Sequence, residues 1–346
     1  MPPTSAPVPG ARPAMRLLTA LAALMLTLGL TACGGGSDDG GSGNAAPSGA
    51  AGESFPVTVE HLYGATEVKK RPQRIVTIGL SDHEPVLAFG HKPVGVVDWF
   101  ERKPFSDWPW TKALWGGTEP TNLGLREENI NFEKLLSLRP DLIVAVYSGI
   151  QKAQYEKLSK IAPVIAQPKG HDPYAAPWQV MTLQIGKGLG QEVKAKRLVA
   201  DIEAKFAEVR EANPQWKGKT ALAADSFKAG TYFAFQQGDP KSGFLADLGF
   251  TVPPKINKEA GKLNGVEFGS ERLDLLDVDR LVWITTGKEP QPRIKNDSVY
   301  RTLKVAKEGR DLFLTYQDPP IGGAISFNTV LSIPYAIDQL VPLLKK

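Results

Sequence analysis

The sequence predicts an α/β protein in which two lobes with mostly parallel sheets are joined by a single long helix. Apolar runs typical of buried strands alternate with helical patterns on both sides of residues 177–213. This middle region carries the longest helical periodicity in the chain, and the two flanking regions are similar in length and pattern. We therefore expect a first lobe over residues 54–176, a connecting helix region over 177–213 and a second lobe over 214–346.

The connecting helix is the clearest element. Apolar residues recur at steps of four and three and form one stripe, which comprises Ala195, Val199, Ile202, Phe206 and Val209. Gly188 and Gly190 interrupt the pattern before it, and Asn213-Pro214 ends it. From Gln191 to Ala212 an α-helix extends about 33 Å. Such a helix spans a small domain, so it can join two lobes.

Composition limits the possible functions. The chain has 346 residues, of which 42% are hydrophobic, enough for two compact domains. The net charge of +4 is small and no dense basic stripe is present, so we expect no nucleic-acid partner. The single cysteine excludes a disulfide framework, thiolate zinc sites and iron–sulfur ligation. The four histidines are scattered, and we expect no metal site and no cofactor.

Residues 1–32 have the pattern of a secretory signal peptide. Arg12 and Arg16 precede a short apolar run that ends just before Cys33. The sequence Leu-Thr-Ala-Cys at residues 30–33 looks like a bacterial lipobox, which implies lipidation of Cys33 and anchoring to a membrane. The alternative is a buried cysteine beside a chance apolar stretch. Residues 33–53 are rich in Gly, Ser and Ala and predict a flexible tether after the lipidated residue.

The elements of the first lobe follow in order. The residues Phe55, Val57 and Val59 alternate as in a strand, and Tyr63-Gly64-Ala65 offers a turn. Strands are predicted at 74–78, 93–98, 141–147 and 164–166, and helices at 82–89, 131–137 and 151–160. A long loop rich in Trp and Pro follows the second of these strands. Because strands and helices alternate, we expect a Rossmann-like parallel sheet with helices on both faces.

The same alternation resumes after the connecting helix. Strands are predicted at 220–224, 232–235, 280–285 and 312–315, and helices at 241–248, 271–277 and 328–345. The second lobe is therefore expected to be Rossmann-like as well.

Two short segments match each other across the long helix. Glu133 opens a helical pattern and Asp141 follows eight residues later, before a buried strand; Glu271 and Asp279 repeat this spacing. Acids are common at helix N-termini because they interact favourably with the helix dipole, so the match can arise by chance. The other interpretation is that two equivalent exposed acids, one on each lobe, dock one symmetric partner.

From about Phe55 to Lys346 the chain resembles the substrate-binding lipoproteins of ABC importers for iron–siderophores, a group that also handles haem and cobalamin. The resemblance rests on the order of several local patterns along the chain. They are FPVTVEH at 55–61, RPQRIV at 71–76, DHEPVLAFG at 82–90, NFEKLLSLRPDLI at 131–143 and LKVAKEGR at 303–310. It implies two α/β lobes on one long helix, with little movement on binding. It also implies that Glu133 and Glu271 pair with arginines on the two copies of the permease.

In this family the ligand is expected in the cleft between the lobes, outside the carboxyl ends of the parallel strands. Aromatic residues at these predicted strand ends offer flat apolar walls for a bulky ligand. They are Trp99, Phe100, Tyr147, Phe227, Tyr232 and Tyr316. A single aromatic residue after a strand more often packs than binds, and it is their number that favours a site.

Arg126 lies seven residues before Glu133, where hydroxamate-siderophore binders have an arginine that reaches the oxygens around iron. A guanidinium group donates a planar pair of hydrogen bonds to such oxygens. The alternative is a solvated arginine paired with Glu127 or Glu128. The second lobe departs from the hydroxamate binders, because it has Gly265-Val266-Glu267-Phe268 and Asp318-Pro319-Pro320-Ile321 where they have tryptophans.

These observations leave three functions. The first is a monomeric binding protein on the extracytoplasmic face of the cell membrane that captures a ferric siderophore, of hydroxamate type, and delivers it to an ABC importer permease dimer. The second is a haem or cobalamin binder with Tyr147 or His83 as axial ligand. The third is a lipid-anchored enzyme. No nucleophile–base pair or paired acids are found at a plausible spacing, so we expect no enzymatic activity.

Overall fold

A computed structural model describes residues 55–99, 107–285 and 289–345. Residues 49–346 form one compact unit, which contains all of the described residues. The predicted signal peptide, the lipidation site Cys33, the tether and Phe100 lie outside the described residues. None of the helices in the described part of the chain has the length and apolarity needed to span a membrane. The lobe boundaries at 176 and 214 stay predictions.

The first lobe is built on a five-stranded sheet in the order β5-β4-β3-β6-β7, and every pair of neighbours is parallel. Its strands are β3 (Ile75–Thr77), β4 (Gly95–Asp98), β5 (Thr121–Leu125), β6 (Leu142–Val144) and β7 (Val164–Ile165). Strands β3, β4 and β6 are buried along their whole length, as expected for a sheet covered on both faces. The alternating stretch and the turn after it belong to an antiparallel hairpin of β1 (Val57–His61) and β2 (Gly64–Val68), whose second strand was not predicted.

Short helices connect these strands. They are α1 (His83–Ala88), α3 (Lys112–Trp115), η1 (Glu127–Asn129), α4 (Phe132–Ser137) and α5 (Lys152–Ser159). Helix α4 begins where expected because the Asn131 side chain accepts the backbone N–H of Lys134 at 2.9 Å, which caps the first turn. The edge strand β5 and helix α3 lie in the segment expected to be a loop, so that expectation was wrong.

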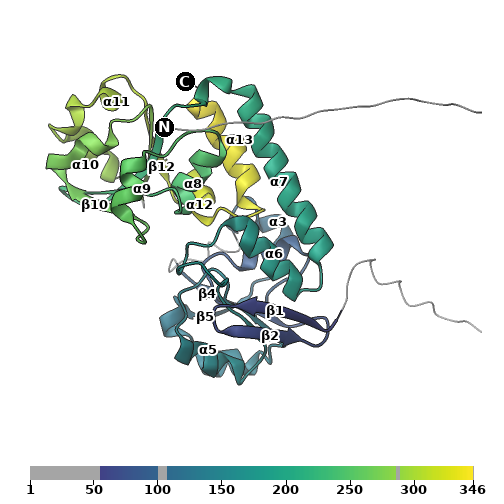
Figure 1. Cartoon of the computed structure of the whole chain (residues 1–346). Helices are drawn as coiled ribbons and strands as arrows, with labels where there is room; N and C mark the ends of the chain where they lie inside the picture. Colours follow the sequence, from purple (N-terminus) through teal and green to yellow (C-terminus); the bar gives the residue numbers. More distant parts are fainter. Residues whose placement is uncertain (1–54, 100–106, 286–288, 346) are drawn as a thin grey trace, which may run out of the picture. The chain divides into compact units, whose positions relative to one another are not determined.

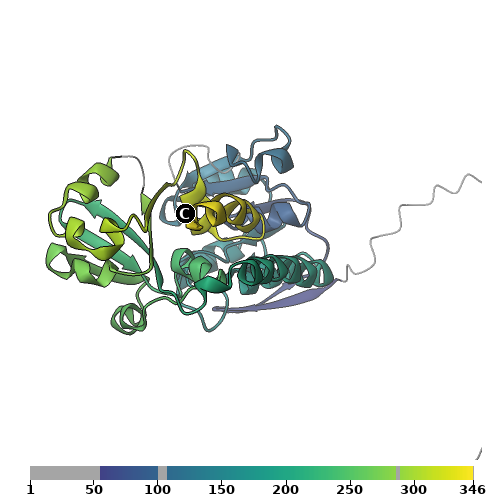
Figure 2. The same ribbon diagram turned by 90° about the horizontal axis from the view of Figure 1, so that it is seen from above.

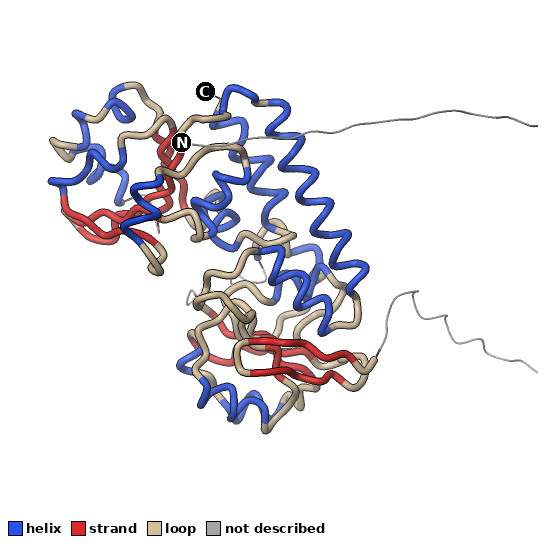
Figure 3. Tube along the Cα trace, in the orientation of Figure 1, coloured by secondary structure: helices blue, strands red, loops and turns tan. Residues whose placement is uncertain are grey.

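The second lobe has a mixed sheet in the order β10-β9-β8-β11-β12. Strands β8, β11 and β12 are parallel, whereas β9 is antiparallel to both β8 and β10. The strands are β8 (Ala221–Lys228), β9 (Thr231–Phe235), β10 (Gly265–Gly269), β11 (Arg280–Thr285) and β12 (Asp311–Thr315). Figure 3 shows the strands of the two lobes as separate groups. The predicted α/β fold with mostly parallel sheets is therefore confirmed.

Two of the helices expected in the second lobe differ from those that the structure has. The remaining elements are η2 (Pro214–Trp216), α8 (Pro240–Asp247), α9 (Pro254–Ala260), η3 (Ser270–Leu276), α10 (Pro290–Asn296), η4 (Tyr300–Thr302), α11 (Lys304–Lys307), α12 (Ile321–Phe327) and α13 (Ser332–Leu344). The prediction of a regular helix over 271–277 was wrong. This segment is a 3₁₀ helix that is kinked at Arg272, and the Arg272 guanidinium donates to the Glu259 carboxylate at 2.6 and 2.7 Å. The final helix starts at Ser332, because Asn328 adopts a left-handed conformation and ends α12.

The long helix α7 runs from Glu192 to Ala212, within one residue of the predicted range. A separate helix, α6 (Trp178–Gly188), precedes it, and Gly190 with φ of 71° makes the break between them. Near its start α7 packs on α6, and towards its end the Phe206 ring meets Phe244 of α8 with centroids 5.5 Å apart. Helices α7 and α13 also lie side by side in Figures 1 and 2. One helix therefore joins both lobes.

One of the apolar clusters of the described residues runs through both lobes. It includes Ile75 and Leu142 of the first sheet, Phe206 of α7, Val282 of the second sheet and Ile333 of α13, all less than 5% exposed. Protein cores are close-packed, so a shared core opposes sliding of one lobe against the other.

A second contact between the lobes is polar and aromatic. The buried carboxylate of Glu84 on α1 accepts the Trp110 indole N–H at 2.8 Å and the hydroxyl hydrogen of Thr329, which lies between α12 and α13. The Trp108 and Trp110 rings stack with centroids 5.0 Å apart, and Phe327 meets Trp108 edge-on. The C-terminal segment is thus fastened to the first lobe at Glu84.

Gly186 lies where α6 packs closely against α7 and Phe89. A Cβ atom there would lie 2.5 Å from Ala195 Cβ and 2.7 Å from Phe89 Cζ. Gly186→Ala should therefore lower the free energy of unfolding by about 1–3 kcal/mol through overpacking. This outweighs the gain of about 1 kcal/mol in helix propensity. Urea denaturation measures the change, with Ala204→Gly on the exposed face of α7 as the gauge of propensity alone. A variant more stable than the wild type would contradict the close contact.

Candidate functional site

Three aromatic side chains cluster beyond the carboxyl ends of the first sheet. Trp99 follows β4, Tyr147 follows β6 and Tyr174 follows β7. The Tyr174 ring meets both others edge-on, with centroids 5.7 Å from Trp99 and 5.7 Å from Tyr147. Trp99 and Tyr174 are half-buried, whereas Tyr147 is buried. The cluster presents ring surface at the sheet edge where a ligand was expected.

Asp82 fixes the position of Tyr147. Its buried carboxylate accepts the backbone N–H groups of Gly79 at 3.0 Å, Val146 at 2.9 Å and Tyr147 at 2.8 Å. Burial raises the pKa of Asp82 to about 6, although these three N–H groups lower it. A Cβ on Gly79 would lie 2.3 Å from an Asp82 oxygen, so glycine is required there. The loops after β3 and β6 are thereby tied into one unit.

Glu127 fixes Tyr174 in the same way. One of its carboxylate oxygens accepts the Tyr174 hydroxyl at 2.5 Å and the Gly149 N–H at 2.8 Å. Burial raises the pKa of Glu127, and these two donors partly offset the rise. The pKa of Tyr174 is raised as well, by burial and then by its bond to Glu127. The aromatic cluster is therefore held by two buried carboxylates.

Arg126 lies at the rim of this cluster. Its side chain is exposed and its guanidinium carbon lies 6.0 Å from the centroid of the Trp99 ring. Its backbone has φ of 58°, and its N–H donates to the carbonyl of Asp98 at 2.8 Å. Within the described part of the chain Arg126 forms no ion pair with Glu127 or Glu128. The guanidinium is oriented over an aromatic ring rather than paired with a neighbouring acid.

The facing part of the second lobe carries a buried ion pair. Lys241 of α8 lies 3.1 Å from the Asp239 carboxylate, and its ammonium is 4.0 Å from the centroid of the Phe235 ring. Burial alone would lower the pKa of Lys241, but the charge of Asp239, followed by Tyr316 and Asp225, raises it. A lysine held in this way stays charged at any physiological pH.

Asp225 in the second half of β8 and Arg293 of α10 complete the polar groups of the second lobe. Burial raises the pKa of Asp225 to about 6, although the hydrogen bond from the Ser226 N–H and the charges of Lys241 and Arg293 lower it. The Arg293 guanidinium donates to the carbonyl and, at 3.2 Å, to the hydroxyl oxygen of Ser226. Phe227 next to them is 64% exposed, an unusual exposure for phenylalanine and consistent with a ligand contact.

The Tyr147 hydroxyl lies within electrostatic range of the second lobe. The pKa of its hydroxyl is raised well above the usual range by burial, and then by Asp239 and Tyr316 of the second lobe. Tyr147 of the first lobe therefore lies close to both residues. The structure brings together Trp99, Arg126 and Tyr147 in the first lobe, and places Tyr316 of the second lobe beside Tyr147.

Two of the expected ligand residues lie elsewhere. Tyr232 is 3% exposed, packs in the second-lobe core and donates its hydroxyl to Asp297 at 2.7 Å. His83 is 4% exposed at the start of α1, and burial lowers its pKa to about 3, so it is neutral. Both side chains are part of the protein interior.

Glu133 and Glu271 are both exposed, each in the first turn of a short helix. Asp141 and Asp279, which follow them, accept equivalent hydrogen bonds from the backbone. Asp141 accepts the N–H groups of Gln73 and Arg74 at the start of β3, and Asp279 accepts the N–H of Thr220 at the start of β8. The match between the two segments thus reflects one arrangement that occurs in both lobes, with a glutamate on the surface each time.

Three residues of this region were not predicted. Tyr174 follows β7, so the rule for strand ends applied to residues 164–166 would have found it. Lys241 and Arg293 lie on helices, and no local pattern distinguishes them from solvated basic residues. Among the described residues no group of three or more His, Cys, Asp or Glu could hold a metal ion.

Comparison with known proteins agrees with this architecture. A family model described as "Periplasmic binding protein" matches residues 75–310, which is more than half of the chain. The chain belongs to the periplasmic binding protein family. The family expected from the local patterns is thereby confirmed, and its members bind ligands for ABC transporters rather than catalyse reactions.

Individual relatives of this periplasmic binding protein cover most of its length. A putative ABC transporter substrate-binding lipoprotein of Bacillus subtilis is 26% identical, over 85% of this chain and 88% of the relative. A periplasmic solute binding protein from Mycobacterium smegmatis has a similar structure, with a TM-score of 0.73, 32% identity, and coverage of 84% and 97%. An iron uptake protein of Streptococcus pneumoniae in complex with ferrichrome has a TM-score of 0.69 and 26% identity, over 83% of this chain and 97% of that chain.

Proposed function

We propose that this protein captures a ferric siderophore between its two lobes outside the cytoplasmic membrane and delivers it to the permease of an ABC importer. The observation that carries the proposal is the cluster of Trp99, Tyr147 and Tyr174 with Arg126 at its rim, beyond the carboxyl ends of the first sheet and within electrostatic range of the second lobe. The similarity of this chain to the ferrichrome-bound protein of Streptococcus pneumoniae supports the proposal. The siderophore holds the iron, and the protein contacts only the outer surface of the complex.

The chemistry of the rim favours a hydroxamate siderophore. Such a complex presents anionic oxygens around iron within a bulky organic shell. The Arg126 guanidinium can donate a pair of hydrogen bonds to these oxygens, and Trp99 beneath it contacts the organic part. Exposed Phe227 supplies an apolar contact from the second lobe.

The outer surface and the N-terminus complete the proposal. Glu133 and Glu271, one exposed on each lobe, pair with arginines of the two permease subunits. Lipidation of Cys33 anchors the protein to the extracytoplasmic face of the membrane, and residues 34–53 serve as the tether. The protein works as a monomer, since one copy supplies both docking acids.

A haem ligand receives no support from the site. Haem iron needs an accessible side chain, such as His or Tyr. His83 and Tyr147 are each only 4% exposed. Tyr147 is in addition packed between Tyr174 and the second lobe.

The quenching of tryptophan fluorescence tests the ligand. Ferrichrome, a ferric catecholate and ferric citrate are titrated separately, and we expect ferrichrome to bind with a micromolar or lower Kd. Haemin is added in parallel, and its Soret band should not shift. Failure of all three iron complexes to bind at micromolar concentration would refute the proposed function.

Arg126→Ala should weaken ferrichrome binding about tenfold or more. The variant removes a charge-assisted contact of about 1.5–3 kcal/mol. Calorimetric titration measures the Kd. Arg197→Ala is the matched control, because Arg197 is an arginine on α7 whose side chain is 83% exposed. Equal affinities for wild type and Arg126→Ala would show that Arg126 is only a solvated arginine.

A further inference from the structure

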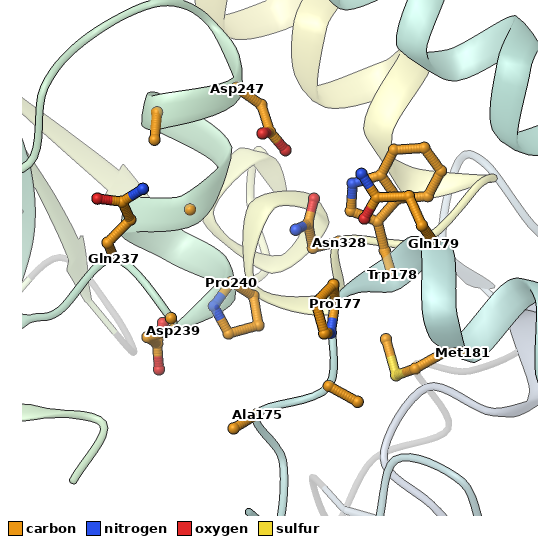
Figure 4. Close-up of a pocket in the computed structure, with 14 residues that line it drawn as sticks. Ala175, Pro177, Trp178, Gln179, Met181, Gln237, Asp239, Pro240, Asp247 and Asn328 are labelled. Atoms are coloured by element: carbon orange, nitrogen blue, oxygen red, sulfur yellow. The ribbon is translucent and has the colours of Figure 1, made fainter. Parts of the chain in front are cut away.

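A pocket lies between the first turn of α6, one side of α8 and Asn328 at the end of α12 (Figure 4). Its volume is about 240 Å³. Trp178, Asn328 and Asp247 line it together with the apolar side chains of Pro177, Met181 and Pro240. None of the side chains predicted to contact the siderophore lines it. The pocket shares Asp239 with the polar groups of the second lobe described above, but its other lining residues are distinct from them, and its occupant does not depend on the proposed function.

Two buried polar atoms of this pocket have no hydrogen-bond partner. Trp178 is 3% exposed, and its indole Nε1 has no acceptor within bonding distance. Asn328 is 6% exposed, and its Oδ1 has no donor. A buried polar group left without a partner costs about 1–3 kcal/mol. One unsatisfied donor and one unsatisfied acceptor in the same pocket indicate a ligand that supplies an acceptor and a donor.

Asp247 gives the pocket its charge. Burial raises the pKa of its carboxyl, and the Trp178 N–H and the charge of Arg210 lower it. The Trp178 N–H therefore faces this carboxylate, although the two groups do not have the geometry of a full hydrogen bond. Arg210 donates to the backbone carbonyl of Asp247 at 2.7 Å and not to its side chain. In Figure 4 the Asp247 carboxylate is directed towards Asn328.

No cationic side chain lines the pocket. The other acid in the lining, Asp239, is already paired with Lys241 at 3.1 Å. The carboxylate of Asp247 forms no ion pair with the residues that line the pocket; Arg210 acts on it only through its charge, and Asp247 is partly buried. Such a carboxylate attracts a cation that can donate hydrogen bonds.

We propose that this pocket binds a small molecule with a primary ammonium group and an oxygen acceptor one or two carbons away. The ammonium donates to the Asp247 carboxylate and to Asn328 Oδ1. The oxygen accepts the Trp178 N–H, and the short carbon chain lies against Pro177, Pro240 and Met181. Amino alcohols and α-amino acids both have this chemistry. The pocket is lined by residues at or next to α6, which precedes α7 in the chain, and α8 and α12, which follow it. Its occupant therefore contacts segments on both sides of α7 in the sequence.

Calorimetric titration at pH 7.5 with four probes separates the possibilities. Ethanolamine and L-alanine carry both groups, ethylamine carries only the ammonium, and propionate carries only the oxygens. We expect ethanolamine, L-alanine or both to bind at least tenfold more tightly than the one-group probes, and the tighter of the two identifies an amino alcohol or an amino acid. No binding of any probe at millimolar concentration would show that the pocket holds only water. Equal binding of ethylamine and ethanolamine would also overturn the proposal.

Asp247→Asn should weaken the best probe at least tenfold. Asp201→Asn is the matched control, since Asp201 is an exposed acid on α7 whose side chain is 62% exposed. Asn328→Gly is a second variant that removes the acceptor, and glycine tolerates the left-handed backbone at this position. Circular dichroism verifies that each variant is folded. A folded Asp247→Asn or Asn328→Gly protein that binds like the wild type would refute the site.

Discussion

Replacing both Glu133 and Glu271 by alanine should reduce the uptake of ferric siderophore into cells to near background, with ligand affinity unchanged. The two carboxylates are exposed on different lobes, and neither takes part in the contacts that form the predicted ligand site. Charges at the rim of an interface mainly steer encounter and fix register, so their loss slows docking to the permease. We expect each single variant to lose at least tenfold in uptake rate and the double variant to lose more.

The control exchanges two other exposed acids. Glu156 lies on α5 of the first lobe and Glu267 on β10 of the second, so their double alanine variant removes the same charge from the same lobes. Radioactive iron uptake and the Kd for the ferric complex are measured for both double variants. Normal uptake with Glu133→Ala and Glu271→Ala, or an equal defect in the control, would contradict docking through these acids.

The parts of the fold that could be predicted are those with a strong local pattern. Helix α7 was placed within one residue because its apolar stripe is continuous and Gly190 and Asn213 limit it. The inner parallel strands were found because they are buried on both faces and read as apolar runs. The edge strands β5 and β10 were missed, since TNLGL and GVEFG hold glycines and polar residues rather than such runs.

The candidate site was less predictable because its geometry depends on packing between distant segments. Tyr232 was expected at the rim, but side chains alternate along β9, and its own points into the second-lobe core. Lys241 is recognisable only once Asp239, Tyr316 and Tyr147 are brought together across the lobes. The carboxylates of Asp82 and Glu127 hold loops that the sequence places 65 and 22 residues away.

Glu84 should make the junction between the lobes weaken as the pH rises. Burial raises the pKa of its carboxyl from 4.5 to about 7, although Thr329 and Trp110 donate hydrogen bonds to it. The other ionisable group beside it, His83, is neutral, because burial lowers its pKa to about 3. A carboxyl whose pKa is higher in the folded state favours the protonated form. Its contribution to stability is complete below pH 4.5 and is lost as the pH rises to about 7.

Comparison with Glu84→Gln isolates this group, because the amide stays neutral at every pH and keeps a hydrogen-bond acceptor. Relative to the variant, the wild type should lose about 3 kcal/mol of unfolding free energy between pH 4.5 and 7, at 1.36 kcal/mol for each pKa unit. Urea denaturation at pH 4.5, 6 and 8 measures the difference, and other buried acids such as Asp82 cancel because both proteins contain them. A constant difference across this range would mean that Glu84 is ionised even at pH 4.5. The bonds from Thr329 and Trp110 would then outweigh burial, and the contact between the lobes would be insensitive to pH.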